Sequence, residues 1–130
     1  MDLLQIKNVM KKYGVAWEKQ DTALLLDCFT KNGCYQESPI AKSYNGHKQI
    51  KKFWDEIVVR DTKNIKFKLG KCYLSNDCKT GFAEWECTND CVANTNREWR
   101  KGHMVGIMIL KMKGNKITNL NEYWNTKKIK

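Results

Sequence analysis

The feature of this sequence that most constrains its fold is a change in hydrophobic period at Ile65. Before Ile65, apolar residues recur every three or four positions, which is the spacing of one helical face. From Ile65 onward they alternate with polar residues, which is typical of half-buried strands. Helices followed by a meander of strands predict an α+β fold, with the helices packed on one face of a sheet.

Three helices are predicted in the first half of the chain. The first carries its apolar face from Leu3 to Trp17. Asp21 is expected to cap the second helix by accepting a hydrogen bond from a free backbone amide, and Asn32-Gly33 is expected to end it. The third helix covers Ile50 to Val58, where the apolar residues follow the helical spacing without a miss.

Five strands are predicted around these helices. The first, Cys34 to Ser38, is stopped by the only proline, Pro39, and is expected to lie at a sheet edge. The second strand starts at Ile65 and is expected to contain a bulge beyond Gly70. The third includes Ala83 to Thr88, the fourth covers Arg97 to Lys113, and the last covers Ile117 to Trp124. Because long strands curl at bulges, the sheet is expected to wrap around the helices and to leave a cavity.

Length and charge limit the classes of protein to which this chain can belong. The 130 residues fit one domain spanning 1–130. Apolar runs are too short and too often interrupted by charge for a signal peptide or a membrane span, so no membrane partner is expected. The net charge is +10, but 21 of the 24 basic residues are lysines scattered from Lys7 to Lys130. A solvated surface is therefore favoured over a specific nucleic-acid face, and nonspecific polyanion binding stays open.

The six cysteines indicate reduced thiols. They stand at positions 28, 34, 72, 78, 87 and 91, without the short paired spacing of a zinc site and far from either histidine. With no export signal, free and mostly buried thiols in a cytoplasmic protein are expected, with no metal and no cofactor.

Several short motifs occur in an order that is similar to a known family. They are Tyr13-x3-Trp17-x3-Asp21, Tyr35-x-Glu37-Ser38-Pro39, Gly46-His47-x2-Ile50-x2-Phe53-Trp54, Ala83-Glu84-Trp85-Glu86 and Glu122-Tyr123-Trp124. Over nearly its whole length the chain resembles the nuclear transport factor 2-like fold, also called the SnoaL-like or steroid-isomerase-like cone. The resemblance implies a cone-shaped, curved mixed sheet wrapped on three N-terminal helices. It implies no single activity, because the fold hosts isomerases, cyclases, dehydratases, epoxide hydrolases and transport adaptors.

The resemblance also yields candidate catalytic residues. Tyr13 stands where steroid isomerases carry an oxyanion-binding tyrosine, but Ser38 occupies the position of their general base. Steroid-isomerase chemistry is therefore not expected, unless Glu37 replaces the base through a shift of one residue. His47, at the start of the third helix, is either a neutral base or a surface residue.

The aromatic content indicates a ligand cavity or a filled core. The alternation of Gly102, Met104, Gly106 and Met108 leaves room on the inward face of one strand. The residues expected to line a cavity are Tyr13, Trp17, Trp54, Trp85, Met104 and Tyr123. The pattern does not fix which of Glu37, Glu84, Glu86, His47 and His103 face it, although Glu84 and Glu86 are expected to face solvent or a partner subunit.

These observations leave three functions open. The first is binding of a small apolar or aromatic molecule, with or without an isomerase, lyase or hydrolase activity that needs no metal. The second is a non-catalytic protein-binding adaptor, and the third is nonspecific polyanion binding. An apolar patch on the outer sheet face, made by Val105, Ile107 and Ile109 beside Lys66 and Lys68, predicts a homodimer.

Overall fold

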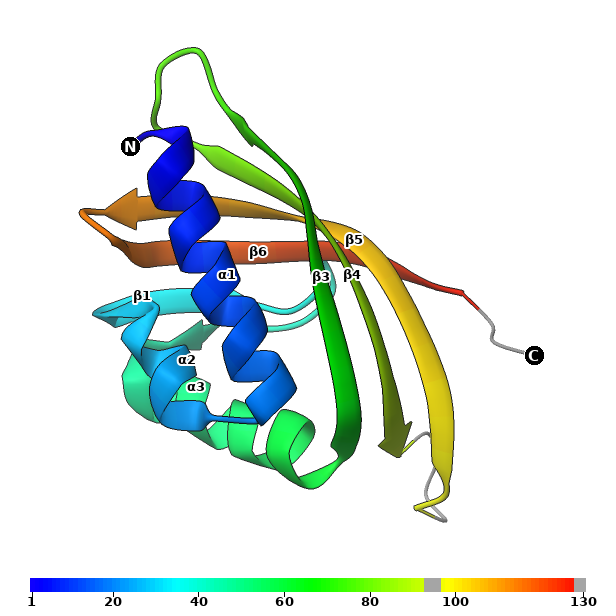
Figure 1. Cartoon of the computed structure of the whole chain (residues 1–130). Coiled ribbons are helices and arrows are strands. Elements are labelled where there is room, and N and C mark those ends of the chain that lie inside the picture. The colour runs from blue at the N-terminus through cyan, green and yellow to red at the C-terminus, as the bar shows by residue number, and fades with distance from the viewer. Residues whose placement is uncertain (93–96, 128–130) are drawn as a thin grey trace.

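The computed structural model describes residues 1–92 and 97–127 as one curled sheet with helices on its concave side (Figure 1). The elements are α1 (Leu3–Lys19), α2 (Thr22–Asp27), β1 (Phe29–Gln36), β2 (Tyr44–Asn45), α3 (Gly46–Trp54), a π-helical segment η1 (Asp55–Arg60), β3 (Thr62–Leu74), β4 (Gly81–Val92), β5 (Trp99–Lys113) and β6 (Lys116–Lys127). The strand order is β2-β1-β6-β5-β4-β3. Because β1 and β6 run parallel and the other pairs antiparallel, the sheet is mixed, which confirms the expected α+β class.

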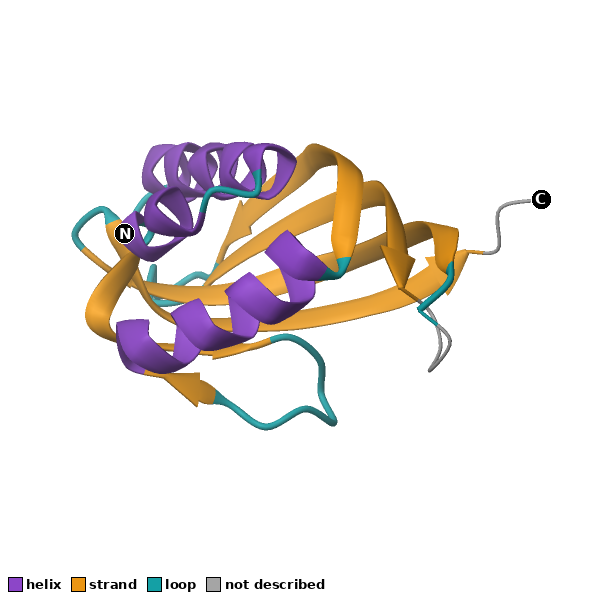
Figure 2. Ribbon diagram, turned by 90° about the horizontal axis from the view of Figure 1, so that it is seen from below, coloured by secondary structure: helices purple, strands orange, loops and turns teal. Residues whose placement is uncertain are grey.

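The concave side of the sheet is covered by α1 and α3, as Figure 2 shows from below. Helix α1 is capped by Asp2, whose side chain accepts a hydrogen bond from the amide of Gln5. Its buried face lies on β3, where the ring of Phe67 meets Tyr13 edge-on at 5.8 Å and stacks on Trp85 of β4 at 5.9 Å. This aromatic layer joins the first helix to β3 and β4, at one edge of the sheet.

The curvature of the sheet has local causes in the sequence. The register of β3 against β4 shifts between Leu69 and Cys72, so the bulge expected beyond Gly70 is present. At Gly106, β5 approaches β6 so closely that an added Cβ would overlap the carbonyl oxygen of Tyr123 and lie 2.7 Å from the Cβ of Trp124. Glycine is required there because no side chain fits between the two strands.

The second helix is shorter than expected. It ends at Asp27 rather than at Asn32-Gly33, and β1 already begins at Phe29. The reason is tertiary: Phe29 is fully buried and pairs with Ile117 of β6, so strand pairing overrides the local helical pattern.

Other element boundaries also differ from those predicted from the sequence. The first strand is not an edge strand, because β2 pairs with it on one side and β6 on the other. The third helix is α-helical only to Trp54 and continues as η1 to Arg60. Strand β4 extends through Asn89 to Val92, because its register against β5 continues to Trp99. Among the described residues, no helix is both long enough and apolar enough to cross a membrane.

We predict that Gly106→Ala lowers the free energy of unfolding by about 1–3 kcal/mol, because the added methyl group must displace the backbone of β6. Gly102→Ala on the same strand is the matched control. Its new Cβ would lie 3.0 Å from the movable end of the Asn89 side chain and 3.7 Å from the sulfur of Cys91, with no backbone atom in the way, so a smaller loss is expected. Urea unfolding of both variants measures the difference, and equal losses would contradict this explanation of the bend.

Candidate functional site

A cavity of about 240 Å³ lies between the helices and the concave face of the sheet. Its apolar wall includes Trp17, Phe53, Met104 and Trp124. Its polar lining includes two carboxyl groups, Glu37 and Glu122, and the amide of Asn89. Glu37, Phe53 and Ile57 also line a more open hollow of about 470 Å³, so the cavity borders a depression of the surface. Such a concave, mostly apolar space with few polar groups is typical of small-molecule sites.

The main polar group of this cavity is the carboxyl of Glu122, which three elements hold in place. Glu122 lies on β6 and is 4% exposed. The hydroxyl of Tyr13, on α1, donates a hydrogen bond to its Oε1, and the hydroxyl of Tyr35, on β1, donates to the same oxygen at 3.0 Å. The two hydroxyls lie 3.1 Å apart. Within the described residues, no hydrogen bond reaches Oε2 of Glu122.

Burial changes the protonation of this carboxyl. Burial raises the pKa of Glu122 to about 8, and the nearby charge of Glu37 adds to the rise, while the hydrogen bonds from Tyr13 and Tyr35 act in the opposite direction. Glu122 is therefore mostly a neutral acid at pH 7. Because both tyrosines donate to Oε1, we assign its proton to Oε2. The side chain then offers an O–H donor in an apolar cavity.

The second carboxyl of the cavity is Glu37, directly after β1. Its backbone oxygen accepts a hydrogen bond from Nε1 of Trp124, which fixes the chain at this point. Partial burial raises the pKa of its carboxyl group above the ordinary value. When two carboxyl groups lie in different environments of one cavity, their pKa values differ, so that one can act as an acid and the other as a base.

Several residues predicted from the sequence to line the cavity lie in or near it. Trp17 and Met104 are part of the wall. Tyr13 is fully buried and meets the cavity through its hydrogen bond to Glu122. Trp54 and Trp85 are core residues outside the lining, Trp54 packing edge-on against Trp17 at 5.5 Å.

Tyr123 lies elsewhere than expected, and Glu122 takes the inward position. Tyr123 is 41% exposed on the outer face of the sheet. The register of β6 against β5 shifts by one residue at Thr118, so the inward residues after it are Leu120, Glu122 and Trp124. Sequence reasoning did not place Glu122 in the site. The sequence feature that could have indicated it is the alternation of Leu120, Glu122 and Trp124. Alternation alone does not say which set of residues points inward, because one bulged residue exchanges the two faces of a strand.

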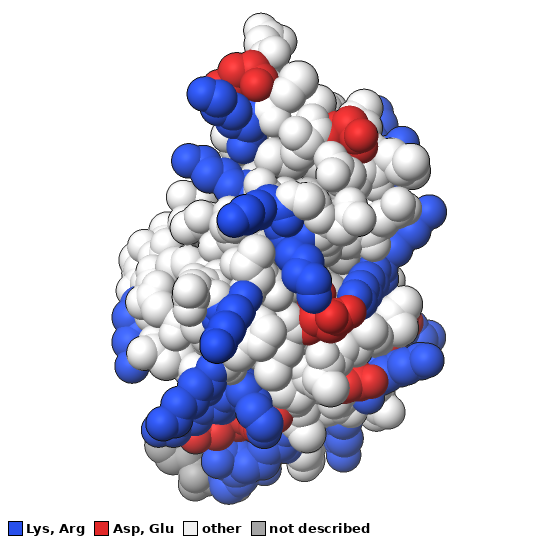
Figure 3. Space-filling view, turned by 90° about the vertical axis from the view of Figure 1, so that its left-hand side faces the viewer, with Lys and Arg blue, Asp and Glu red and all other residues white. Residues whose placement is uncertain are grey.

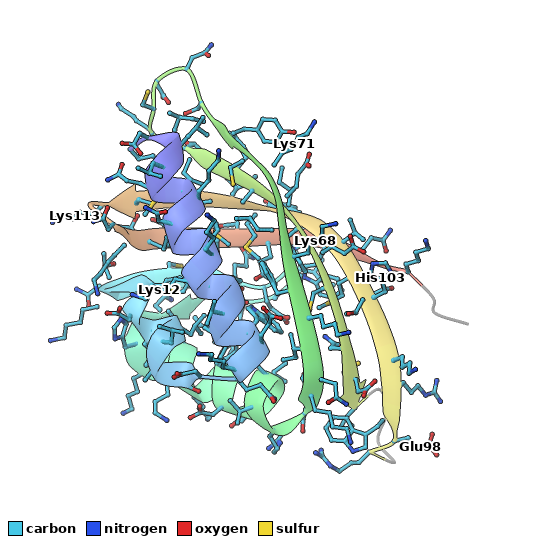
Figure 4. All side chains as sticks on the ribbon, in the orientation of Figure 1. Lys12, Lys68, Lys71, Glu98, His103 and Lys113 are labelled. Atoms are coloured by element: carbon cyan, nitrogen blue, oxygen red, sulfur yellow. The ribbon has the colours of Figure 1, made fainter. Side chains whose placement is uncertain are left out.

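The histidines lie away from this cavity. Nε2 of His47 is 3.2 Å from the backbone oxygen of Phe29, a contact that joins the start of α3 to β1. His103 is on the outer face, where its Nε2 lies 2.6 Å from Oε1 of Glu86; Figure 4 labels it on β5. Glu84, two residues before Glu86 on β4, is exposed and accepts a hydrogen bond from Tyr73 at 3.1 Å.

All six cysteines are free thiols in the structure. Burial raises the pKa values of Cys28 and Cys87 to about 12, so these two thiols stay protonated and are weak nucleophiles. In residues 1–92 and 97–127, no group of three or more His, Cys, Asp or Glu residues is placed to hold a metal ion.

Comparison with known proteins identifies the fold. No family model and no curated protein matches the sequence. Among solved structures, the epoxide hydrolase/cyclase-like enzyme SalBIII, which takes part in pyran ring formation in the polyether salinomycin, superposes with a TM-score of 0.79 at 14% identity, over 95% of this chain and 93% of that one. A ketosteroid isomerase-like protein from Erwinia carotovora atroseptica gives a TM-score of 0.72 at 10% identity, over 94% of this chain and 95% of the other.

A protein described as a SnoaL-like polyketide cyclase, from Shewanella denitrificans, gives a TM-score of 0.76 at 11% identity, over 95% of this chain and 92% of the other. The chain therefore has the nuclear transport factor 2-like cone fold that its motifs resemble. Identities this low establish the fold and leave the activity to the site itself.

We predict that the free energy of unfolding falls as the pH rises from about 5 to about 8. In this range the unfolded chain has lost the Glu122 proton, whose ordinary pKa is 4.5, while the folded chain keeps it up to about 8. The unfolded state binds fewer protons, so a rising pH favours unfolding. Glu122→Gln keeps an acceptor for the tyrosines but cannot ionise, so its slope should be smaller by about 1 kcal/mol per pH unit.

Urea unfolding at several pH values across this range measures the two slopes. Glu84→Gln, which removes an exposed carboxyl on the outer face, is the control and should keep the slope of the wild type. Identical slopes in the wild type and Glu122→Gln would show that Glu122 is not held neutral by the fold.

Proposed function

We propose that this chain binds a small, largely apolar carbonyl compound in the inner cavity and transfers a proton at the carbon next to the carbonyl group. This is the chemistry of an isomerase or a lyase that needs no metal. The observation that carries the proposal is the buried Glu122, kept protonated by its surroundings in the same cavity as Glu37. The likeness to a ketosteroid isomerase-like protein and to a polyketide cyclase supports the same class of substrate.

In this mechanism Glu37 is the general base and Glu122 the hydrogen-bond donor. The carboxylate of Glu37 takes a proton from the carbon beside the carbonyl group, and the electron pair moves onto the carbonyl oxygen. The O–H of Glu122 donates to this oxygen as its negative charge develops. Tyr13 and Tyr35 are positioning residues, because their hydroxyls hold Oε1 and direct Oε2 to the substrate. Glu37 then returns the proton to carbon, which leaves both carboxyl groups as they began.

The direct test uses 2-tetralone, a bicyclic ketone with acidic protons beside its carbonyl group. In D₂O the wild-type protein should accelerate exchange of these protons for deuterium, followed by NMR. Glu37→Gln should lower the rate by about 100-fold or more, because it removes the base. Glu122→Leu should lower it by about 10- to 1,000-fold, because it removes the donor.

His47→Gln is the matched control, since His47 contacts the backbone of Phe29 away from the cavity lining, and it should keep the wild-type rate. Exchange that equals the rate in buffer, or that survives in Glu37→Gln, would refute the proposed activity. Unfolding curves of each variant exclude loss of the fold as the cause.

The outer face of the sheet supports the proposal that two copies of the chain form a dimer. A hollow of about 650 Å³ lies there, with Val105, Ile107 and Tyr123 in its lining. Lys68 of β3 and Glu86 of β4 are paired in register on the same face. In a two-fold dimer this face would meet the same face of a second copy. The apolar residues could then pack together, and the basic positions of one copy could lie near the acidic positions of the other, which favours such a dimer.

We predict that the wild type has the mass of a dimer by light scattering at micromolar concentration and that Val105→Lys has the mass of a monomer. Val105 is 48% exposed on this face, so the change places a charge in the interface without disturbing the core. Leu4→Lys, at an exposed position of α1, is the control and should remain dimeric. A monomeric wild type that also fails to exchange 2-tetralone protons would favour the adaptor function instead, since the outer face would then be open to another protein.

The positive charge supports no specific nucleic-acid partner. Lysine and arginine side chains are spread over the face shown in Figure 3 rather than gathered in one stripe. Some of them are already paired, as Asp27 is with both Lys12 and Lys116. A scattered charge of this kind gives solubility and weak, salt-dependent attraction to polyanions.

A further inference from the structure

The cavity contains a second buried polar group, Asn89, that the proposed proton transfer does not use. Asn89 lies on β4, is 8% exposed and is part of the cavity lining. Among the described residues, its side chain makes one hydrogen bond, which Nδ2 donates to the sulfur of Cys87 at 3.8 Å. A thioether or thiol sulfur is a weak acceptor, and the Oδ1 of Asn89 accepts no hydrogen bond within the described part of the chain. Burying an amide with so little compensation costs free energy, which a ligand could recover.

The neighbouring strand leaves space for this amide. Gly102 of β5 lies opposite Asn89 in the register. A Cβ at Gly102 would come within 3.0 Å of Oδ1 of Asn89, so the absence of a side chain on β5 allows the amide its present position. Gly102 is itself part of the cavity lining. The pair therefore forms a polar corner in an otherwise apolar part of the wall.

This corner and Glu122 lie at separate positions in the lining of the cavity. Asn89 pairs with Gly102 of β5, whereas Glu122 pairs with Met108 of the same strand, six positions further along. The curvature of β5 in Figure 1 shortens the path between the two positions. Glu122 lies near enough to raise the pKa of Cys87, whose sulfur accepts the hydrogen bond from Asn89, so a bicyclic ligand can extend from one group towards the other. The lining between the two positions includes Met104 and Trp124, which are apolar over most of their surface.

We propose that Asn89 is a second recognition point and that the cavity takes an elongated, mostly apolar molecule with a polar oxygen group at each end. One oxygen group meets Glu122, and the other, a hydroxyl or a carbonyl, meets the amide of Asn89. This inference rests on the proposed function, because it assigns the shape and the second functional group of the substrate class. Asn89 acts as a specificity-determining residue and takes no part in the proton transfer.

The test uses three bicyclic probes that differ only in hydroxyl groups, with binding measured by isothermal titration calorimetry. 2-Naphthol has one hydroxyl, 2,6-dihydroxynaphthalene has hydroxyls at opposite ends, and 2,3-dihydroxynaphthalene has both at the same end. The wild type should bind the 2,6-diol about tenfold more tightly than 2-naphthol, the gain of one hydrogen bond to a buried amide. The 2,3-diol should bind no more tightly than 2-naphthol, because its second hydroxyl cannot reach Asn89.

Two variants test whether Asn89 and Gly102 cause the preference for the 2,6-diol. Asn89→Leu, of similar volume, should bind 2-naphthol as the wild type does and lose the preference for the 2,6-diol. Gly102→Ala should lose it as well, because the new methyl group displaces the amide. Cys91→Ala, at the next inward position of β4 in the cavity lining, is the matched control and should keep the preference. Urea unfolding verifies that each variant is folded.

The outcomes separate this inference from the function on which it rests. Equal affinities of the wild type for 2-naphthol and the 2,6-diol, or a preference that survives in Asn89→Leu, would overturn the role of Asn89 alone. Failure of 2-naphthol to bind the wild type, or binding that Glu122→Leu leaves unchanged, would overturn the proposed cavity function and this inference with it. A purely structural role of Asn89 would lower stability and weaken all three probes equally, which also contradicts the proposal.

Discussion

The curvature of the sheet is the constraint on which the rest of this structure depends. Strands β3 to β6 are long enough to need a bend if they are to cover the helices, and the bend uses bulges in β3 and β6 and a strand contact that only Gly106 permits. A flat sheet would pack against α1 along one line and leave no enclosed volume. Because the sheet curls, its concave face surrounds an apolar space, and side chains distant in the sequence meet there.

Within that space, burial sets the chemistry. A carboxyl group in an apolar cavity loses hydration, which disfavours its charge and leaves Glu122 a neutral acid at pH 7. The hydroxyls of Tyr13 and Tyr35 supply the hydrogen bonds that make its burial tolerable, and they come from α1 and β1. The same residues therefore stabilise the core and orient the donor, so the fold and the site share one network.

The two faces of the sheet differ in the role that we propose for each. The inner face holds Glu122 and Asn89 at separate positions along an apolar wall, which suits one elongated ligand. The outer face carries polar contacts such as that of His103 with Glu86, beside exposed apolar residues, which suits another protein surface. Because strand residues alternate between faces, a single strand such as β5 contributes to both.

The sequence by itself determined the order and type of the elements, except for the short strand β2 and the π-helical segment η1. The change of period at Ile65 separated helices from strands, and the motifs from Tyr13 to Trp124 were enough to indicate the cone fold. Only the tertiary structure decided the boundary at Phe29 and the inward position of Glu122. Both follow from pairing between strands that are far apart in the chain. Phe29 is in a strand because it pairs with Ile117 of β6. Glu122 rather than Tyr123 lies on the inner face because β6 contains one bulged residue. Periodicity reports local amphipathicity, whereas register depends on the partner strand, and no local pattern contains that partner.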